Sequence, residues 1–357
     1  MKSARWFVPV LCSLFLLSCD SASDDNGGDP PDNHDTIDYE SIGESAAFPV
    51  GVAVQSSQLA DPDRAEVIPH AFTSLTAEYE MKMSPLWTGV GTYNWTGADA
   101  IVNFAALHSM QVHGHALLWH SAIPAWLDAF PGDDAAFEEA VHDFITTTVS
   151  RYKGKVVSWD VVNEAFDDNG DLRDNLFSQR MGLDYIARMF KYARDADPDL
   201  LLFYNDYGLP GNALKLEAVL DMVDDFQSRD IPIDGVGLQA HVTLEYPDVG
   251  VVETTMDELV SRGLRIHISE LDIRVNPDGT EPGLSADLQT QQKNRYREIV
   301  SAFAALPAEN QFAVTVWGLA DPDSWLINFW GHTDWPLLFN GALRPKPAYY
   351  GFLEAVK

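Results

Sequence analysis

"VVSWDVVNE", residues 156–164, is the stretch that decides the fold. The run from Val156 to Val162 is apolar and rich in β-branched residues, which predicts a strand buried on both faces. It ends on Asn163 and Glu164, and a carboxylate at the end of such a strand is costly to bury unless it has a task. The stretch therefore predicts a buried strand of an α/β fold and makes Glu164 a candidate functional residue.

Similar apolar runs occur along the chain, separated by stretches in which apolar residues recur every three or four positions, as in amphipathic helices. The predicted strands span residues 50–54, 71–75, 112–118, 156–162, 200–204, 235–239, 265–269 and 312–317, and the predicted helices include 98–109, 137–152, 184–195 and 255–262. Strands that alternate with helices indicate parallel βαβ units. At this length the leading architecture is a (β/α)8 TIM barrel, forming a single catalytic domain over residues 42–357.

A doubly wound α/β sheet is the alternative architecture. That fold normally carries a glycine-rich phosphate loop after its first strand. Gly89-Val90-Gly91 and Gly235-Val236-Gly237 lack the third glycine and the strand-to-helix context. The barrel is therefore preferred.

The N-terminal residues predict a secretion signal and a lipid anchor. Lys2 and Arg5 precede an apolar segment that is too short to span a membrane, and Leu16-Leu17-Ser18-Cys19 resembles a bacterial lipobox. We therefore expect residues 1–18 to be a lipoprotein signal peptide, Cys19 to carry the lipid, and residues 19–41 to form an acidic, flexible tether. The alternative is a plain secretory signal. The lipoprotein reading places the domain in the cell envelope, outside the cytoplasm, with membrane contact only through Cys19.

Composition excludes several kinds of function. The chain has 54 acidic and 23 basic residues and a formal net charge of -31, so it would repel the phosphate backbone of nucleic acids. The other cysteine, Cys12, lies in the signal segment. The mature domain therefore has no cysteine for a disulfide, a thiolate metal site or a cysteine nucleophile.

Polar and aromatic residues gather where the predicted strands end, which is where barrel enzymes carry their chemistry. In chain order these are Glu78 and Lys82; His115, Trp119 and His120; Asn163 and Glu164; Asn205, Asp206 and Tyr207; Gln239 and His241; Glu270 and Asp272; and Trp317 and Trp325. Strands four and seven, which end in Glu164 and Glu270, lie well apart around a barrel. The two carboxyl groups would face each other across its mouth, the arrangement that a glycosidase needs.

The neighbouring residue types suggest different roles for the two carboxyls. His241 can hydrogen-bond Glu270, and Asp272 can fix that imidazole, which would keep Glu270 ionised as a nucleophile. Glu164 has Trp159 and Phe166 nearby in sequence, and we expect a less polar setting to keep it protonated as the general acid. Asn163 is placed to bind a sugar 2-hydroxyl.

Taken with their order and spacing, several separated motifs resemble glycoside hydrolase family 10, the retaining endo-β-1,4-xylanases, over roughly residues 45–357. The motifs are "TAEYEMKM", "VHGHALLWHSAIPAWL", "WDVVNEAF", "LFYNDYG", "GVGLQAHV", "ISELDI", "TVWGLADPDSWL" and "RPKPAYYGF". The resemblance implies a (β/α)8 barrel, a cleft of xylan subsites, no cofactor, Glu164 as acid/base and Glu270 as nucleophile. It also implies that further residues bind sugar or orient the carboxylates, namely Glu78, Lys82, His115, Trp119, Asn163, Gln239, His241, Trp317 and Trp325. We expect a monomer that acts on xylan or xylo-oligosaccharides.

Two positions depart from the family pattern. Tyr79 stands where the family usually has Asn, and Ala122 stands where it usually has Gln. Both usual residues help to hold the glycone side of the chain. Hydrolysis should survive these changes, whereas the hold on the distal glycone sugar becomes an open question.

Four other interpretations fit the sequence less well. His113-x-His115 with His120 can suggest a metal-dependent barrel, but the His-x-His pair of such enzymes belongs on the first strand. Asp167-x-Asn169-x-Asp171 resembles a calcium loop, but Leu172 replaces its turn glycine. A non-enzymatic glycan-binding lipoprotein would not need both carboxylates. A β-glucanase barrel would share the carboxylate pair, but Lys82, His115 and Gln239 favour the xylanase.

Overall fold

The computed structural model describes residues 37–357. The predicted signal segment, the lipidation site Cys19 and most of the predicted tether lie outside this range. One compact unit extends from Tyr39 to Lys357. The ring of Tyr39 lies 5.2 Å from that of Tyr349 and 5.0 Å from that of His70. These contacts tie the start of the unit to the last helix and to the first long one.

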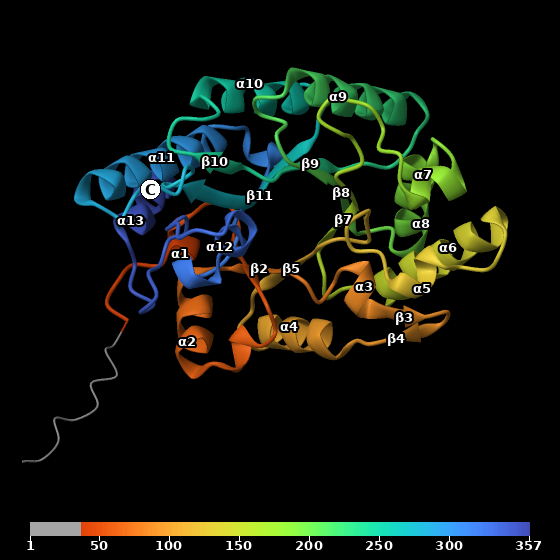
Figure 1. The fold of residues 1–357 in the computed structure, drawn as a ribbon, viewed down its shortest axis with the longest axis horizontal. Helices are drawn as coiled ribbons and strands as arrows, with labels where there is room; N and C mark the ends of the chain where they lie inside the picture. Colours follow the sequence, from red (N-terminus) through yellow and green to blue (C-terminus); the bar gives the residue numbers. More distant parts are fainter. Residues whose placement is uncertain (1–36) are drawn as a thin grey trace, which may run out of the picture. The chain divides into compact units, whose positions relative to one another are not determined.

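The centre of the unit is a closed barrel of parallel strands (Figure 1). Its strands pair in the order β1-β2-β5-β7-β8-β9-β11-β12, and β12 pairs with β1 to close the ring. The barrel strands are β1 (Val50–Val54), β2 (Ser74–Ala77), β5 (Gln111–Gly114), β7 (Ser158–Asn163), β8 (Leu201–Asp206), β9 (Gly235–Leu238), β11 (Arg265–Arg274) and β12 (Gln311–Val316). Two short strands extend the barrel at its mouth, β6 (Leu118–Trp119) beside β7 and β10 (His241–Thr243) beside β11, and β3 (Trp87–Gly89) pairs with β4 (Thr92–Tyr93) outside it. The (β/α)8 prediction is confirmed.

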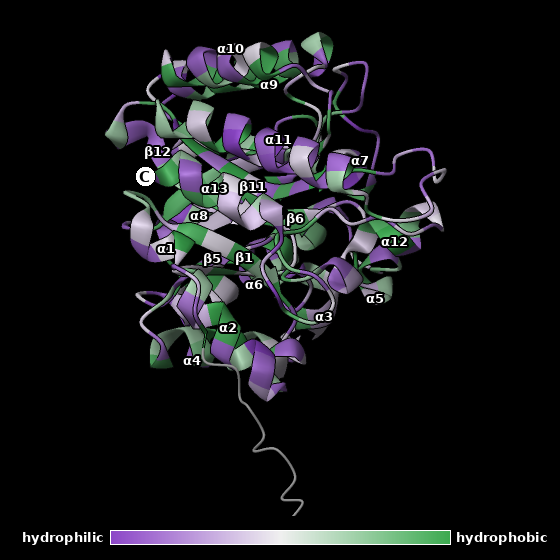
Figure 2. Cartoon of the chain, turned by 90° about the vertical axis from the view of Figure 1, so that its left-hand side faces the viewer, coloured by the Kyte–Doolittle hydropathy of each residue, from purple (hydrophilic) through white to green (hydrophobic). Residues whose placement is uncertain are grey.

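Helices surround the barrel, and those between consecutive barrel strands return the chain to the next parallel strand (Figure 1). The long outer helices are α2 (Pro62–Ala71), α4 (Thr96–Leu107), α6 (Asp134–Tyr152), α8 (Tyr185–Ala196), α9 (Ala213–Ser228), α10 (Val249–Val260), α11 (Ala286–Ala304) and α13 (Pro347–Val356). The shorter ones are α1 (Ile42–Ser45), α3 (Met83–Leu86), α5 (Ala125–Asp128), α7 (Leu176–Met181) and α12 (Trp325–Trp330), with 3-10 turns at Gln58–Ala60, Ala308–Asn310 and Asp321–Asp323. Figure 2 shows hydrophilic and hydrophobic residues alternating along the outer helices, as expected when one face packs on the barrel.

The predicted second strand is wrong at its start. Residues 71–75 were expected to be extended, but Ala71 ends α2 and β2 begins at Ser74. The helix runs on because Asp61 caps its first turn and the N–H of Phe72 still bonds the carbonyl of Ile68. An apolar run therefore continued from a helix into a strand, which hydrophobic pattern alone does not separate.

Two other strands differ from the prediction in ways that affect the site. The third predicted strand is broken into β5 and β6, although the N–H of Leu117 between them still bonds the carbonyl of Asp160 in β7. The seventh, predicted over residues 265–269, continues to Arg274, so Glu270 and Asp272 lie within β11. The site residues are thus held by strand hydrogen bonds instead of a loop.

The barrel interior below the mouth is partly polar. Nδ1 of His113 lies 2.7 Å from the hydroxyl of Ser158, and Nε2 of His267 lies 2.8 Å from the hydroxyl of Thr315. All four residues are buried, together with Asp160. Because buried polar groups need partners, these pairs constrain how the strands fit together.

Within residues 37–357, no helix combines the length and apolar composition that crossing a membrane requires.

Candidate active site

Glu164 and Glu270 both lie at the carboxyl-terminal end of the barrel. Glu164 directly follows β7, and Glu270 lies in the second half of β11. Two strands, β8 and β9, separate them around the ring. The N–H of Glu164 bonds the carbonyl of Asn205 at 2.9 Å, and the N–H of Glu270 bonds the carbonyl of Gln239 at 3.0 Å. The main chain of each carboxylate residue is therefore anchored to a neighbouring strand.

The carboxyl of Glu270 is buried and surrounded by polar partners. Asn205 Nδ2 donates to its Oε1 at 2.8 Å, and His241 Nε2 lies 3.2 Å from its Oε2. Burial by itself would raise the pKa of Glu270, but the hydrogen bond from His241 and the positive charges nearby outweigh it and leave the pKa below its usual value. Glu270 is therefore held as a carboxylate, the form that can act as a nucleophile.

His241 is fixed between two carboxylates. Its Nδ1 lies 2.9 Å from Asp272 Oδ2, which also accepts a hydrogen bond from the indole Nε1 of Trp325 at 2.9 Å. Burial lowers the pKa of His241, but Asp272 and Glu270 overcome this effect and raise it to about 10. The imidazole is therefore a cation at neutral pH and donates through both nitrogens. The sequence predicted this His241–Glu270–Asp272 arrangement, and the structure brings the three residues together.

The carboxyl of Glu164 accepts hydrogen bonds from neutral groups. Trp119 Nε1 donates to Oε2 at 2.9 Å, while Gln239 Nε2 and Asn163 Nδ2 donate to Oε1 at 3.0 and 3.3 Å. The apolar setting expected from Trp159 and Phe166 is not what this carboxyl meets. The ring of Trp159 fills the space next to Gly114, and that of Phe166 lies 5.9 Å from Tyr204.

Amide side chains connect the two carboxylates. Asn163 Oδ1 accepts from Asn205 Nδ2 at 3.0 Å and from Gln239 Nε2 at 3.3 Å, so hydrogen bonds run from Glu164 to Glu270 through neutral amides. Space for Asn205 depends on a glycine, because a Cβ on Gly237 would lie 2.1 Å from its Oδ1. A residue with any side chain at that position would push Asn205 away from Glu270.

Lys82, Trp119, His115 and Trp317 form two paired contacts near the carboxylates. Lys82 Nζ lies 4.6 Å from the ring centre of Trp119, and the rings of His115 and Trp317 meet edge to face at 5.3 Å. Burial lowers the pKa of Lys82, and the charge of Glu270 is the largest effect opposing it. Lys82, predicted to bind sugar, therefore lies close enough to Glu270 for the two charges to interact.

Glu78 and the two positions that depart from the family pattern lie on the β2 and β6 side. Glu78 accepts from Gln55 Nε2 at 3.2 Å, and burial raises its pKa. Tyr79 is 52% exposed, whereas Ala122 is buried, with its N–H bonded to the carbonyl of Trp119. The ring of Tyr79 is thus available to a ligand, and the methyl group of Ala122 offers no polar contact.

Two of the histidines that could suggest a metal-dependent barrel contact a carboxylate instead. His113 Nε2 and His115 Nδ1 both lie 2.9 Å from the same oxygen of Asp160. In the suggested calcium loop, Asp167 Oδ1 accepts from the main-chain N–H groups of Asn169 and Asp171 and so caps a turn. In the described part of the chain, three possible metal ligands converge only on the outer face of α6, at Glu139, His142 and Asp143.

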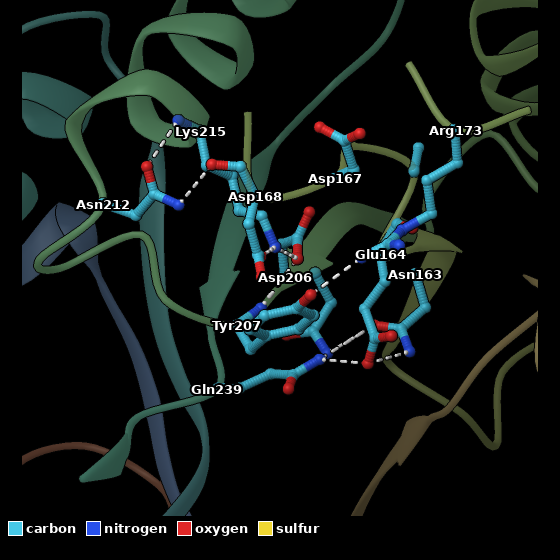
Figure 3. Close-up of polar contacts among 12 residues, drawn as sticks. Asn163, Glu164, Asp167, Asp168, Arg173, Asp206, Tyr207, Asn212, Lys215 and Gln239 are labelled. Atoms are coloured by element: carbon cyan, nitrogen blue, oxygen red, sulfur yellow. Dashed lines mark hydrogen bonds and ion pairs between the residues drawn. The ribbon is translucent and has the colours of Figure 1, made fainter. Parts of the chain in front are cut away.

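Sequence reasoning missed several residues that support the site. Asp160 orients His115. Residues two apart share one face of a strand, so Ser158 and Asp160 on one strand lie opposite His113 and His115 on the next. That spacing was the signal for Asp160. Three more residues belong to this region, namely Arg173, Tyr204 and Lys215. Figure 3 shows Arg173 near Glu164 and Lys215 near Asp206. No local pattern marks these three, since their contacts join β7, β8 and α9.

The chain is similar in sequence to known proteins. Residues 41–355 match the sequence profile of glycosyl hydrolase family 10. The chain is 39% identical over 339 residues to the endo-beta-1,4-xylanase Xyn10C of Cellvibrio japonicus, covering 87% of this chain and 56% of that protein. The chain thus spans about half the length of that relative.

The fold is also similar to those of solved xylanase structures. A mutant of xylanase 10C from Cellvibrio japonicus in complex with xylopentaose aligns with a TM-score of 0.86 at 38% identity, over 89% of this chain and 69% of that one. A GH10 endoxylanase retrieved from a sugarcane soil metagenome aligns with a TM-score of 0.83 at 34% identity, over 89% of this chain and 100% of that one. The barrel fold is therefore shared with these proteins.

Proposed function

The chain belongs to glycosyl hydrolase family 10, and we propose that it is a retaining endo-β-1,4-xylanase that hydrolyses internal xylosidic bonds of xylan. One observation carries the proposal: Glu270 is held as a carboxylate by His241 and Asn205, while a second carboxyl, Glu164, stands across the barrel mouth. A retaining glycosidase needs one carboxylate as nucleophile and one carboxylic acid to protonate the leaving oxygen.

In the first step Glu270 forms a bond to the anomeric carbon as the glycosidic bond breaks. Glu164 gives its proton to the departing oxygen, which leaves as the hydroxyl of the shortened chain. Asn205 and the His241 cation orient the attacking carboxylate, so no reorganisation of the site is required as the bond forms.

In the second step water replaces the leaving sugar. Glu164, now a carboxylate, takes a proton from the water while the oxygen of that water attacks the anomeric carbon. The bond to Glu270 breaks and the carboxylate returns to its starting state. Two inversions at one carbon give a product that retains the β configuration.

The surrounding residues suit a sugar ligand. Asn163 lies between the two carboxylates, in position to meet the 2-hydroxyl of the sugar being cleaved. Glu78, Lys82, His115 and Gln239 supply polar contacts, and Trp119, Trp317 and Trp325 supply faces on which sugar rings can pack. The xylopentaose bound by a related xylanase supports xylan as the substrate class.

A product profile tests the proposal. Purified protein is incubated with arabinoxylan, glucuronoxylan, mixed-linkage β-glucan and carboxymethyl-cellulose, and the released oligosaccharides are separated. We expect rapid release of xylo-oligosaccharides of several lengths from both xylans. Faster release of gluco-oligosaccharides from the two glucans would replace the xylanase with a β-glucanase, and xylose as the sole early product would contradict internal cleavage.

We further propose that the enzyme is a monomer anchored to the cell envelope through lipid on Cys19. The sequence around that cysteine supports the anchor, and the acidic segment that follows is long enough to separate the barrel from a membrane. An anchored endo-enzyme would release oligosaccharides next to the cell that produced it.

A further inference from the structure

The backbone of Glu164 has a conformation that side-chain-bearing residues rarely adopt. Its φ is 56°, in the left-handed region, where Cβ crowds the main chain. A residue persists in that region only when surrounding contacts hold it there, and such residues gather at active sites. The contacts around Glu164 therefore show which groups keep its carboxyl aimed at the barrel mouth.

The peptide group between Glu164 and Ala165 is held at both of its polar ends. Arg173 Nε donates to the carbonyl oxygen of Glu164 at 3.0 Å, and the N–H of Ala165 donates to the hydroxyl of Tyr204, also at 3.0 Å. A peptide group is one rigid plane, so two hydrogen bonds at opposite edges fix its rotation. Together with the strand bond of the Glu164 N–H, they set the direction in which the side chain leaves the backbone.

Both holding residues lead back to Asp206. The hydroxyl of Tyr204 donates to Asp206 Oδ2 at 2.5 Å. Arg173 Nη2 donates to the hydroxyl of Tyr207 at 2.8 Å, and the main-chain N–H of Tyr207 donates to Asp206 Oδ1 at 2.9 Å (Figure 3). The contacts of Tyr204 and of Arg173 therefore both end on the buried carboxylate of Asp206.

Lys215 supplies the opposite charge behind this carboxylate. It is fully buried, and its Nζ lies 3.2 Å from both Asp206 Oδ1 and Asp168 Oδ1 and 3.3 Å from the ring centre of Tyr207. A lysine so enclosed is costly to bury unless it is paired, and here one ammonium group joins the loop after β7 to the loop after β8. The support for Glu164 is thus a connected set of contacts.

We propose that Arg173 and Tyr204, backed by the Asp206–Lys215 ion pair, are positioning residues that aim the Glu164 carboxyl at the glycosidic oxygen. This inference rests on the proposed function. It assigns the four residues to the proton transfers of Glu164, to the leaving group and then from water, and leaves the attack by Glu270 to the separate His241 arrangement.

Leaving-group chemistry tests this assignment. 2,4-Dinitrophenolate departs from its β-xylobioside without being protonated, whereas the sugar leaving group of xylotetraose needs the acid. We expect R173M to lower kcat/KM for xylotetraose about 10- to 100-fold, as misplacement of a reacting group does, and to change kcat/KM for the dinitrophenyl substrate less than about threefold. KM for xylotetraose should stay near the wild-type value, because the side chain of Arg173 makes its contacts with Glu164 and Tyr207.

Two further variants and a control complete the experiment. R173K keeps a donor for the Glu164 carbonyl but cannot bridge to Tyr207, so its loss should be intermediate. Y204F removes the partner of the Ala165 N–H and should show the same preference for the activated substrate. R180M is the matched control, since Arg180, like Arg173, joins a backbone carbonyl to a side-chain oxygen, here those of Gly132 and Asp134. Both substrates should be cleaved as by the wild type.

Rates are expressed per intact site, counted from the initial burst of dinitrophenolate, so that partial unfolding does not imitate misplacement. Equal losses on both substrates, or no loss on either, in R173M, R173K and Y204F would overturn the positioning role while leaving the xylanase proposal standing. A wild-type protein that cleaves neither substrate would overturn the proposed function and this inference with it.

Discussion

The imidazole of His241 lies 3.2 Å from the carboxyl of Glu270, and its other nitrogen lies 2.9 Å from Asp272. This places a cation directly beside the proposed nucleophile. By contrast, the carboxyl of Glu164 accepts its hydrogen bonds from an indole and two amides, none of which carries charge. Two glutamates on one barrel therefore have different electrostatic surroundings, as two carboxyls with different roles require.

Removing the cation should shift the pH dependence of catalysis. In H241Q the pKa of Glu270 loses the hydrogen bond and the charge of His241, which help to keep it low, so the acid limb of the kcat/KM profile on xylotetraose should move to higher pH. At its optimum the variant should lose about 10- to 100-fold, the worth of one hydrogen bond between charged groups. H142Q, on the outer face of α6, should keep the wild-type profile. An unmoved acid limb in H241Q would argue against this role for the cation.

The same histidine predicts a pH-dependent stability. Its pKa rises from 6.5 in the unfolded chain to about 10 in the folded protein, so the folded state binds the proton more tightly. Its stabilising contribution is therefore complete below pH 6.5 and is lost as the pH rises through 10. Urea unfolding should show the free-energy difference between wild type and H241Q shrinking across that interval. A constant difference would mean that His241 is not charged in the folded protein.

The two glutamates should be separable by azide rescue. E270A should lose activity on xylan by on the order of 10⁴-fold or more, and E164A by about 10²- to 10⁴-fold, with both proteins folded. With 2,4-dinitrophenyl β-xylobioside, azide should restore turnover of E164A and give the β-azide, because it attacks the glycosyl-enzyme from the side that water uses. E270A should give the α-azide, and E253A on the exposed face of α10 should behave as wild type. The reverse pattern of azides would exchange the two roles.

Stereochemistry gives an independent check on the double displacement. Proton NMR during early hydrolysis of xylotetraose should show the β anomer of the product first, followed by slow mutarotation to the α anomer. A single displacement would instead produce the α anomer at once, and that result would exclude a covalent bond to Glu270.

The lipid anchor can be tested on whole cells. C19A should move the enzyme from the membrane fraction to the soluble fraction, because the lipid is the proposed membrane contact. C12A changes the other cysteine of the chain and should leave the enzyme with the membranes. Unchanged fractionation of C19A would point to a different mode of retention.

The sequence was sufficient for the architecture because the relevant signals are local. An apolar run bounded by polar residues marks a strand wherever it lies, and strands separated by amphipathic helices imply the barrel. Once the barrel is granted, residues that follow strands must gather at one end, so Glu164, Glu270 and His241 could be named together. The spacing of Glu270 and Asp272, two residues apart on one strand, put both on the face that meets His241.

Prediction failed where two kinds of local signal overlapped. Residues 71–75 continue the apolar pattern of α2 into β2, and only the hydrogen bond from Phe72 to Ile68 shows where the helix ends. The surroundings of Glu164 were also misjudged, because Trp159 and Phe166 are near it in sequence but pack against Gly114 and Tyr204.

What the sequence determined by itself is the barrel and the residues at its mouth, since period, strand length and residue type are properties of neighbouring positions. What only the tertiary structure decided is the state and aim of those residues. The charge on His241 depends on the two carboxylates beside it, which overcome the effect of burial, and the direction of Glu164 depends on Arg173 and Tyr204 reaching one peptide group from two different segments. Burial and strand register fix such relationships, and both exist only once the chain has closed into the barrel.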